Sequence, residues 1–97
     1  MRIDILHVTD CPNVVPVLSR LREALDELRI VSDVRVVEVT TTDQAERVGM
    51  KGLPTILIDG RDPFPAPGPS LACRLYRNSG VFDGAPSAEA LIEVLAR

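Results

Sequence analysis

The sequence predicts an α/β domain built on a four-stranded mixed sheet with helices on both faces. Three observations lead to this prediction: strand-like and helix-like periodicities alternate in the first part of the chain, an aliphatic strand in the second part ends in a hairpin turn, and a short amphipathic helix follows. The expected strands are 3–8, 34–39, 55–58 and 73–77, in the element order β-α-β-α-β-β-α. The first two strands should be parallel and the last two antiparallel.

The first strand and the helix after it carry the clearest pattern. Residues 2–8 (RIDILHV) place apolar side chains on both faces, which is typical of a central buried strand. Asn13 is the expected N-cap residue of the helix, and Pro16 then falls on the third helical position, where its missing N–H group is not needed. An apolar stripe at steps of four and three predicts about four helical turns. The stripe comprises Val14, Leu18, Leu21, Leu25 and Leu28.

A second strand and a short helix follow. Residues 34–39 (VRVVEV) predict the strand, so that strand, helix and strand form a right-handed βαβ unit. Asp43 is expected to cap the short helix, with Glu46 three residues later completing a capping box. Gly49 is a natural helix stop.

The next strand is bounded by turn residues. Pro54 stands at the start of the aliphatic strand 55–58, which is a permitted position for proline. Asp59-Gly60 at its end predicts a hairpin, so the following strand should return antiparallel. Residues 61–70 (RDPFPAPGPS) hold four of the eight prolines and indicate a stiff, irregular loop.

The last part of the chain completes the sheet and the helical layer. Residues 73–77 (CRLYR) are the expected returning strand. Ser87 is expected to cap a final helix over 88–96, because Ala88, Leu91, Ile92 and Leu95 share one face.

Length and composition narrow the class of protein. The chain has 97 residues, 45% hydrophobic and 26% charged, which suits one globular domain over 1–97. A net charge of −3 argues against nucleic acid as a partner, and no apolar run approaches the ~20 residues of a membrane span. The first residues lack the features of a secretory signal, so a cytoplasmic location is expected. Two cysteines are too few for a disulfide scaffold.

Two motifs carry the chemistry. Cys11-Pro12 follows the first strand and precedes the long helix, and Gly52-Leu53-Pro54-Thr55 opens an aliphatic strand. With this arrangement the chain resembles the thioredoxin fold superfamily over nearly its whole length, most specifically in VGMKGLPTILIDG (48–60). The resemblance implies a cis Pro54 beside Cys11, with the backbone of Leu53 free to pair with an extended substrate. It also implies substrate contacts from Pro12, Asn13 and Thr55.

The chain departs from the family at one decisive position. The family's Cys-x-x-Cys motif corresponds here to Cys11-Pro12-Asn13-Val14, so a dithiol cycle through these four residues is impossible. Cys11 stands where a helix presents unpaired N–H groups and the positive end of its dipole, which favours the nucleophilic thiolate. The neighbouring Asp10 opposes this effect, because a carboxylate disfavours a second anion beside it.

Cys73 is the second candidate catalytic residue, and the sequence leaves two placements open. If Cys73 begins a strand antiparallel to 55–58, it lies more than ~10 Å from Cys11, too far for a disulfide. If the loop 61–72 folds back over the active end, the two sulfur atoms can meet. The loop exceeds the usual hairpin length, which permits both placements and is itself a hint of function.

These residues predict thiol-based redox or thiol-exchange chemistry with Cys11 as the attacking thiolate. Resolution would come from an external thiol such as glutathione or from Cys73, so the expected partner is a low-molecular-weight thiol or a protein thiol or disulfide. No cofactor is expected, and two cysteines with one histidine cannot form a closed zinc site. One alternative is a non-enzymatic binding module that uses the groove beside Pro54. The oligomeric state does not follow from the sequence.

A second alternative, the handling of mercury or organomercurials, rests on a narrower resemblance. The Cys-Pro helix start, residues 52–64 and the later LACRLY resemble small thioredoxin-like proteins described as alkylmercury-lyase-like. Cleavage of a carbon–mercury bond needs two thiolates and an acid. The nominal set is Cys11 and Cys73 with one of Asp10, Asp59 or Asp62. His7 shares a face with Ile3 and Ile5 and is interpreted as a packed, hydrogen-bonded residue rather than a base.

Overall fold

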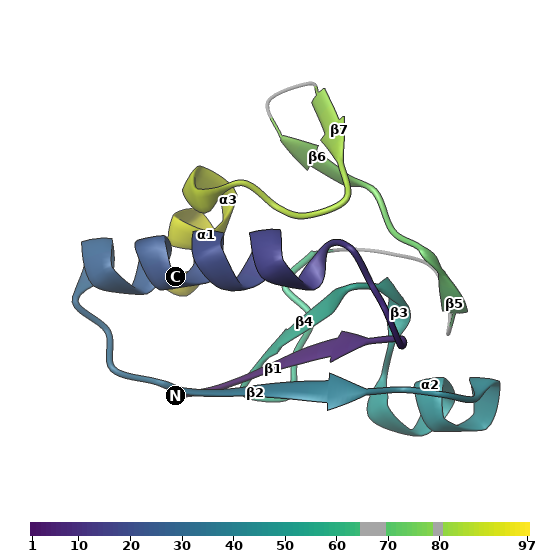
Figure 1. Cartoon of the computed structure of the whole chain (residues 1–97). Helices are drawn as coiled ribbons and strands as arrows, with labels where there is room; N and C mark the ends of the chain where they lie inside the picture. Colours follow the sequence, from purple (N-terminus) through teal and green to yellow (C-terminus); the bar gives the residue numbers. More distant parts are fainter. Residues whose placement is uncertain (65–69, 79–80) are drawn as a thin grey trace.

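The chain folds into a mixed α/β structure, as predicted (Figure 1). The computed structural model describes residues 1–64, 70–78 and 81–97. In chain order the elements are β1 (Arg2–His7), α1 (Val14–Leu28), β2 (Asp33–Glu38), α2 (Thr42–Val48), β3 (Lys51–Leu53), β4 (Thr55–Ile58), β5 (Ser70–Cys73), β6 (Tyr76–Asn78), β7 (Val81–Asp83) and α3 (Ala88–Leu95).

The main sheet has three strands in the order β2-β1-β4. β2 runs parallel to β1, with Ile5 opposite Val36, and this confirms the predicted βαβ unit. β4 runs antiparallel to β1, with Ile5 opposite Ile56. β1 is therefore the central strand, and its C-terminal end leads into the turn that holds Cys11.

One face of this sheet is covered by α1 and α3, which lie side by side above it (Figure 1). The alternate residues Ile3 and Ile5 of β1 point to this face, because side chains alternate along a strand. With Ile56 they are fully buried among aliphatic residues of both helices. The other buried members of this cluster are Val17, Leu21, Ala24, Ala85, Leu91 and Leu95.

The opposite face is covered only in part. Leu6 of β1 and Leu57 of β4 are buried there in a second cluster with Val39, Ala45 and Met50. α2 lies at one end of the sheet (Figure 1) and contributes Ala45 to this cluster. Helices thus contribute to both faces, as predicted, but Asp4 of β1 lines an open cavity on the second face.

The predicted fourth strand over 73–77 is wrong. Residues of β5 pair in parallel with β3, and β6 pairs antiparallel with β7, so the described residues form one three-stranded sheet and two two-stranded sheets. The predicted hairpin turn forms, with positive φ at Asp59 and Gly60, but the returning ladder contains only the pair Ile58–Arg61. Pro63, two residues after Arg61, lacks the N–H group that would extend this ladder along β4.

The helix ends differ from the predictions in two details. Thr41, not Asp43, caps α2, since its hydroxyl accepts from the Gln44 amide. Asn13 is at the N-cap position of α1 but makes no side-chain capping hydrogen bond. Gly49 ends α2 in the left-handed conformation, as predicted. The predicted cap of α3 is also confirmed, because the Ser87 hydroxyl accepts from the Ala90 amide.

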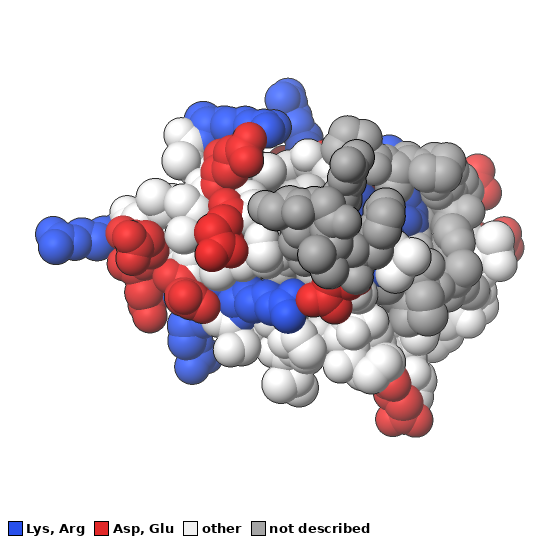
Figure 2. All heavy atoms as spheres, turned by 90° about the horizontal axis from the view of Figure 1, so that it is seen from above, with Lys and Arg blue, Asp and Glu red and all other residues white. Residues whose placement is uncertain are grey.

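Charges of both signs are mixed on the helical side of the molecule. Figure 2 views this side and shows acidic and basic side chains interspersed among the described residues. No helix in the described ranges is long and apolar enough to span a bilayer.

Candidate functional site

Cys11 lies in the turn that joins β1 to α1. The chain turns after β1 with Asp10 at a φ of 59° and with a hydrogen bond of 3.2 Å from the Cys11 amide to the Val8 carbonyl. Cys11 precedes the first residue of α1, Val14, by three positions. Its thiol is free and its side chain is partly exposed. The turn therefore presents the sulfur near the start of the helix, as the sequence predicts.

The buried side of Cys11 contacts the second hydrophobic cluster. Cys11 packs with Val8 and Val37 against this cluster, which includes Met50 directly before β3 and Leu57 within β4. These two residues stand on either side of Pro54 in the chain. Cys11 is thus at the margin of the smaller core and not within the larger one between the sheet and α1.

The start of α1 is held by the segment before α3. The Asn13 amide group lies so close to Gly84 that a Cβ atom at Gly84 would collide with it. Arg20 donates hydrogen bonds to the carbonyls of Ala85 (3.1 Å) and Pro86 (3.3 Å). Because the first turn of α1 contains no acidic residue, no side chain there offsets the positive end of the helix dipole behind Cys11.

The Pro54 segment is fixed by hydrogen bonds from both sides. The buried hydroxyl of Thr55 donates to the Gly52 carbonyl (2.5 Å) and accepts from the Lys51 amide (3.0 Å). The Tyr76 hydroxyl donates to the Pro54 carbonyl at 2.5 Å. Pro54 and Thr55 are both fully buried. Of the predicted substrate-contacting residues, these two are therefore packed inside the molecule.

A buried ion pair supports Tyr76. Arg74 contacts Asp62 through two nitrogens, at 2.6 and 3.3 Å, and the side chains of both residues are about 95% buried. Arg74 also donates to the Phe64 carbonyl, and its guanidinium carbon lies 4.7 Å from the centre of the Tyr76 ring. The rings of Phe64 and Tyr76 meet edge to face at 5.2 Å. Burial raises the pKa of Tyr76, so its hydroxyl stays protonated as a donor to Pro54.

Neither Arg74 nor Tyr76 belongs to a motif that predicts a functional role. Tyr76 is the one tyrosine of the sequence and follows Arg74 by two residues, and Asp62 and Phe64 stand earlier in the chain. This spacing does not by itself predict that the four side chains are in contact. Nothing in the local pattern indicates that Asp62, Phe64, Arg74 and Tyr76 come together beside Pro54.

The backbone of Cys73 lies beside Leu53. In the pairing of β5 with β3, Cys73 is the register partner of Leu53. The backbone of β5 therefore lies beside the strand that leads to Pro54, which agrees with the second of the two placements left open by the sequence. The side chain of Cys73 and residues 65–69 lie outside the described part of the chain.

This pairing bears on the predicted substrate groove. One side of β3, which contains Leu53, is paired with β5 of the same chain, so an extended substrate could pair with Leu53 only from the other side.

The acids suggested for protonating a carbon–mercury bond do not gather around Cys11. The Asp59 amide donates to the Arg2 carbonyl (2.8 Å) at the start of β1, so the length of β1, roughly 16 Å, separates Asp59 from the Cys11 end. Asp62 is held by Arg74. Asp10 alone of the three stands next to Cys11, and its side chain is exposed.

His7 behaves as the sequence interpretation expects. Its Nδ1 atom lies 2.7 Å from the Val8 carbonyl, to which it donates, and its side chain is partly buried. Within the described ranges no three side chains of His, Cys, Asp or Glu come close enough to hold a metal ion.

Comparisons of the chain with protein-family models, with curated proteins and with solved structures gave no match. The function is therefore inferred from the residues and contacts described above.

Proposed function

We propose that the chain is a thioredoxin-like thiol-exchange protein in which Cys11 is the attacking thiolate. The observation that carries the proposal is the position of Cys11, a free and partly exposed thiol three residues ahead of a fifteen-residue helix. A cysteine at a helix N-terminus is favoured as thiolate, the form that attacks disulfides. The parallel β1-α1-β2 unit and the antiparallel β4 agree with such a fold.

The reaction begins when the Cys11 thiolate attacks one sulfur of a partner disulfide. A mixed disulfide forms between Cys11 and that sulfur, and the other sulfur leaves as a thiolate. The thiolate of an external thiol then attacks the partner's sulfur in the mixed disulfide, forms a new disulfide with it and releases Cys11 as a thiolate. If Cys73 attacks instead, a Cys11–Cys73 disulfide forms, the partner is fully reduced, and an external thiol must later reduce the protein.

The placement of Cys73 favours including it as a resolving residue. Its backbone is paired with Leu53, directly before Pro54, and Cys11 packs against the cluster that contains Met50 directly before β3. Both cysteines therefore neighbour the segment 50–54, Cys73 through backbone pairing and Cys11 through side-chain packing. A bond between them would close a large loop and add about 2–4 kcal/mol of stability.

The experiment is a mass measurement on reduced protein treated with oxidised glutathione. The Cys73→Ser variant should accumulate a glutathione adduct on Cys11, and the wild type should convert it to an internal disulfide, with a mass lower by two hydrogens than the reduced form. Cys11→Ser serves as the matched variant and should form an adduct far more slowly. Equal adduct formation in the two variants would overturn the role given to Cys11.

A wild type that keeps the adduct without forming an internal disulfide would assign resolution to the external thiol. A protein whose Cys11 reacts with oxidised glutathione only after unfolding in urea would instead be a non-enzymatic binding module.

A further inference from the structure

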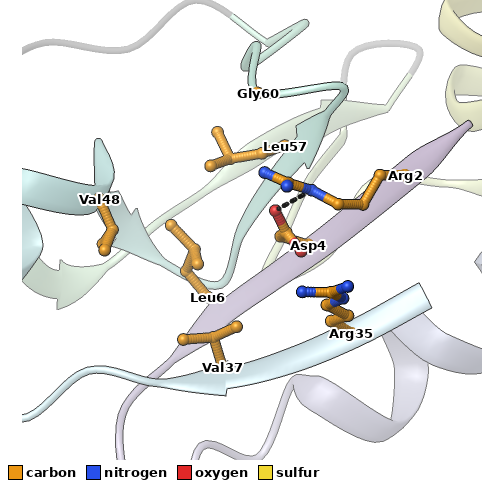
Figure 3. Close-up of a pocket in the computed structure, with 8 residues that line it drawn as sticks. All are labelled: Arg2, Asp4, Leu6, Arg35, Val37, Val48, Leu57 and Gly60. Carbon is orange, nitrogen blue, oxygen red and sulfur yellow. Dashed lines mark ion pairs between the residues drawn. The ribbon is translucent and has the colours of Figure 1, made fainter. Parts of the chain in front are cut away.

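A cavity of about 340 Å³ opens on the partly covered face of the main sheet (Figure 3). Its floor is aliphatic and is formed by Leu6, Val37 and Leu57 from the three strands, and Val48 at the end of α2 forms a wall. The remaining lining includes two arginines and one aspartate: Arg2, Arg35 and Asp4. The volume is at the small end of the roughly 300–1,000 Å³ that is typical of ligand pockets.

Asp4 is an unusual residue for the centre of a sheet. It lies on the central strand between its register partners Arg35 and Leu57, and it is only 8% exposed. Burial of a carboxylate is unfavourable unless it is paired, and an aliphatic residue would fit the neighbouring floor. Packing alone therefore does not explain Asp4, and residues that violate the packing rules of a fold concentrate at functional sites.

The ion pair of Asp4 orders one arginine at the cavity. The Nε atom of Arg2 lies 3.2 Å from the Asp4 carboxylate, and the Arg2 side chain is half exposed. In Figure 3 the Arg2 and Arg35 side chains lie on either side of Asp4, and the Arg2 contact is the ion pair drawn. Asp4 thus neutralises one of the two guanidinium groups.

Arg35 is held only weakly by its own partner. Its Nε atom lies 3.3 Å from Asp33, and both side chains are at least 60% exposed, so the attraction is screened by water. Asp59, the remaining nearby acid, accepts from the backbone amide of Arg2 (2.8 Å). Within the described part of the chain, no acceptor is hydrogen-bonded to the terminal nitrogens of Arg2 or Arg35. Both guanidinium groups therefore keep outward N–H donors at the rim of an aliphatic floor.

We propose that this cavity binds a small organic anion in which one carboxylate or phosphate group is attached to an apolar body. The oxyanion would accept from the terminal nitrogens of Arg2 and Arg35, because the planar guanidinium matches both groups in a two-pronged contact. The apolar body would cover Leu6, Val37 and Leu57. A cationic ligand is disfavoured, because it would have to displace Arg2 from Asp4.

Four probes of similar size separate charge from shape: benzoate, phenyl phosphate, benzyl alcohol and benzylamine. Each is titrated into the full-length protein at low salt, and amide chemical shifts are followed by NMR. The two anions should give saturable shifts centred on Asp4, Arg35, Val37 and Leu57, with binding that weakens as salt is raised. Preference for the phosphate or for the carboxylate identifies which oxyanion the cavity takes.

Variants of Arg35 make the test specific. Arg35→Gln alters an exposed side chain and should weaken anion binding about tenfold while the fold is retained. Arg35→Lys keeps the charge without the planar fork and should fall between Arg35→Gln and the wild type. The matched control is Arg22→Gln, which removes an exposed arginine of α1, on the other side of the sheet, and should leave binding unchanged.

Three results would overturn the proposal: binding of benzyl alcohol or benzylamine as tight as that of the anions, unchanged anion binding in Arg35→Gln, or no saturable shifts with either anion at millimolar concentration. The site does not depend on the thiol chemistry. Cys11→Ser should bind the anions as the wild type does, so this proposal and the proposed function fail separately.

Discussion

The two faces of the three-stranded sheet differ in what covers them and in which side chains they carry. The face under α1 and α3 receives Ile3 and Ile5 from β1, and both are fully buried. The other face receives the buried Asp4 and Leu6, borders the partly exposed Cys11 and carries the cavity of Figure 3. Because successive residues of a strand point to opposite faces, one six-residue strand supplies both surfaces. The comparison shows that the larger buried cluster lies on one face, and that the candidate site and the cavity lie on the other.

The largest expected effect tests the covered face. Ile5→Ala removes a fully buried side chain between the sheet and the helices and should lower the free energy of unfolding by about 4 kcal/mol. The chain has no tryptophan, so urea unfolding is followed by circular dichroism. The control is Val36→Ala on the neighbouring strand, where the side chain is 46% exposed. This variant should change the free energy of unfolding by less than about 1 kcal/mol. Equal losses would mean that the burial of Ile5 between the sheet and the helices does not contribute to stability.

The next effect concerns the support of Pro54. Arg74→Gln leaves the Asp62 carboxylate buried without its partner and should destabilise the protein by about 3 kcal/mol. The double variant Asp62→Asn/Arg74→Gln should recover part of this loss, because no charge remains buried. A double-mutant cycle from urea unfolding measures the coupling between the two side chains. Additive losses would show that the pair does not act as a unit.

A smaller effect depends on pH. Burial raises the pKa of Tyr76 above its ordinary value of 10.0, so the folded state keeps the proton that the unfolded state releases. The resulting stability is fully present below pH 10 and should decline as the pH rises beyond it. Tyr76→Phe removes both this dependence and the hydrogen bond to Pro54, at a cost of about 1–2 kcal/mol near neutral pH. Parallel stability curves for both proteins above pH 10 would contradict the account.

The smallest effect concerns the segment that holds the start of α1. A hydrogen bond from Arg20 lowers the pKa of Asp83 below its ordinary value of 3.8. The pair therefore stabilises the fold above pH 3.8 and is lost as the pH falls through the lower, folded-state value. The effect should be slight and should shrink with added salt, since both side chains are partly exposed. If the wild type and Asp83→Asn lose the same stability between pH 5 and pH 3, the Arg20–Asp83 pair does not contribute to it.

The local pattern of the sequence predicts the periodic elements well. Helix α1, the parallel β1 and β2, and the caps at Gly49 and Ser87 all follow from residues close together in the chain. The course of residues 61–78 does not, because a proline-rich loop carries no periodicity that specifies its destination. The pairing of β5 with β3 depends on long-range contacts between residues that have no local signature.

The candidate site likewise contains residues that local motifs predict and residues that only the tertiary structure reveals. Cys11 and Pro54 stand out from their motifs, and the structure places Cys11 in the predicted turn. Tyr76 donates a hydrogen bond to Pro54, and Arg74 forms the buried ion pair with Asp62 beside it. Neither role could be predicted from the sequence, because both contacts are set by tertiary packing. The same holds for the open cavity, because it depends on which part of the second face α2 leaves uncovered.

The most direct test of the central claim is the rate at which Cys11 reacts with iodoacetamide in the folded Cys73→Ser variant at neutral pH. The same variant unfolded in urea provides the reference for an ordinary cysteine. If Cys11 is the attacking nucleophile that we propose, the folded protein reacts at least about fivefold faster. A folded-state rate equal to or below the unfolded-state rate would mean that Cys11 is an inert packing residue, and it would contradict the account.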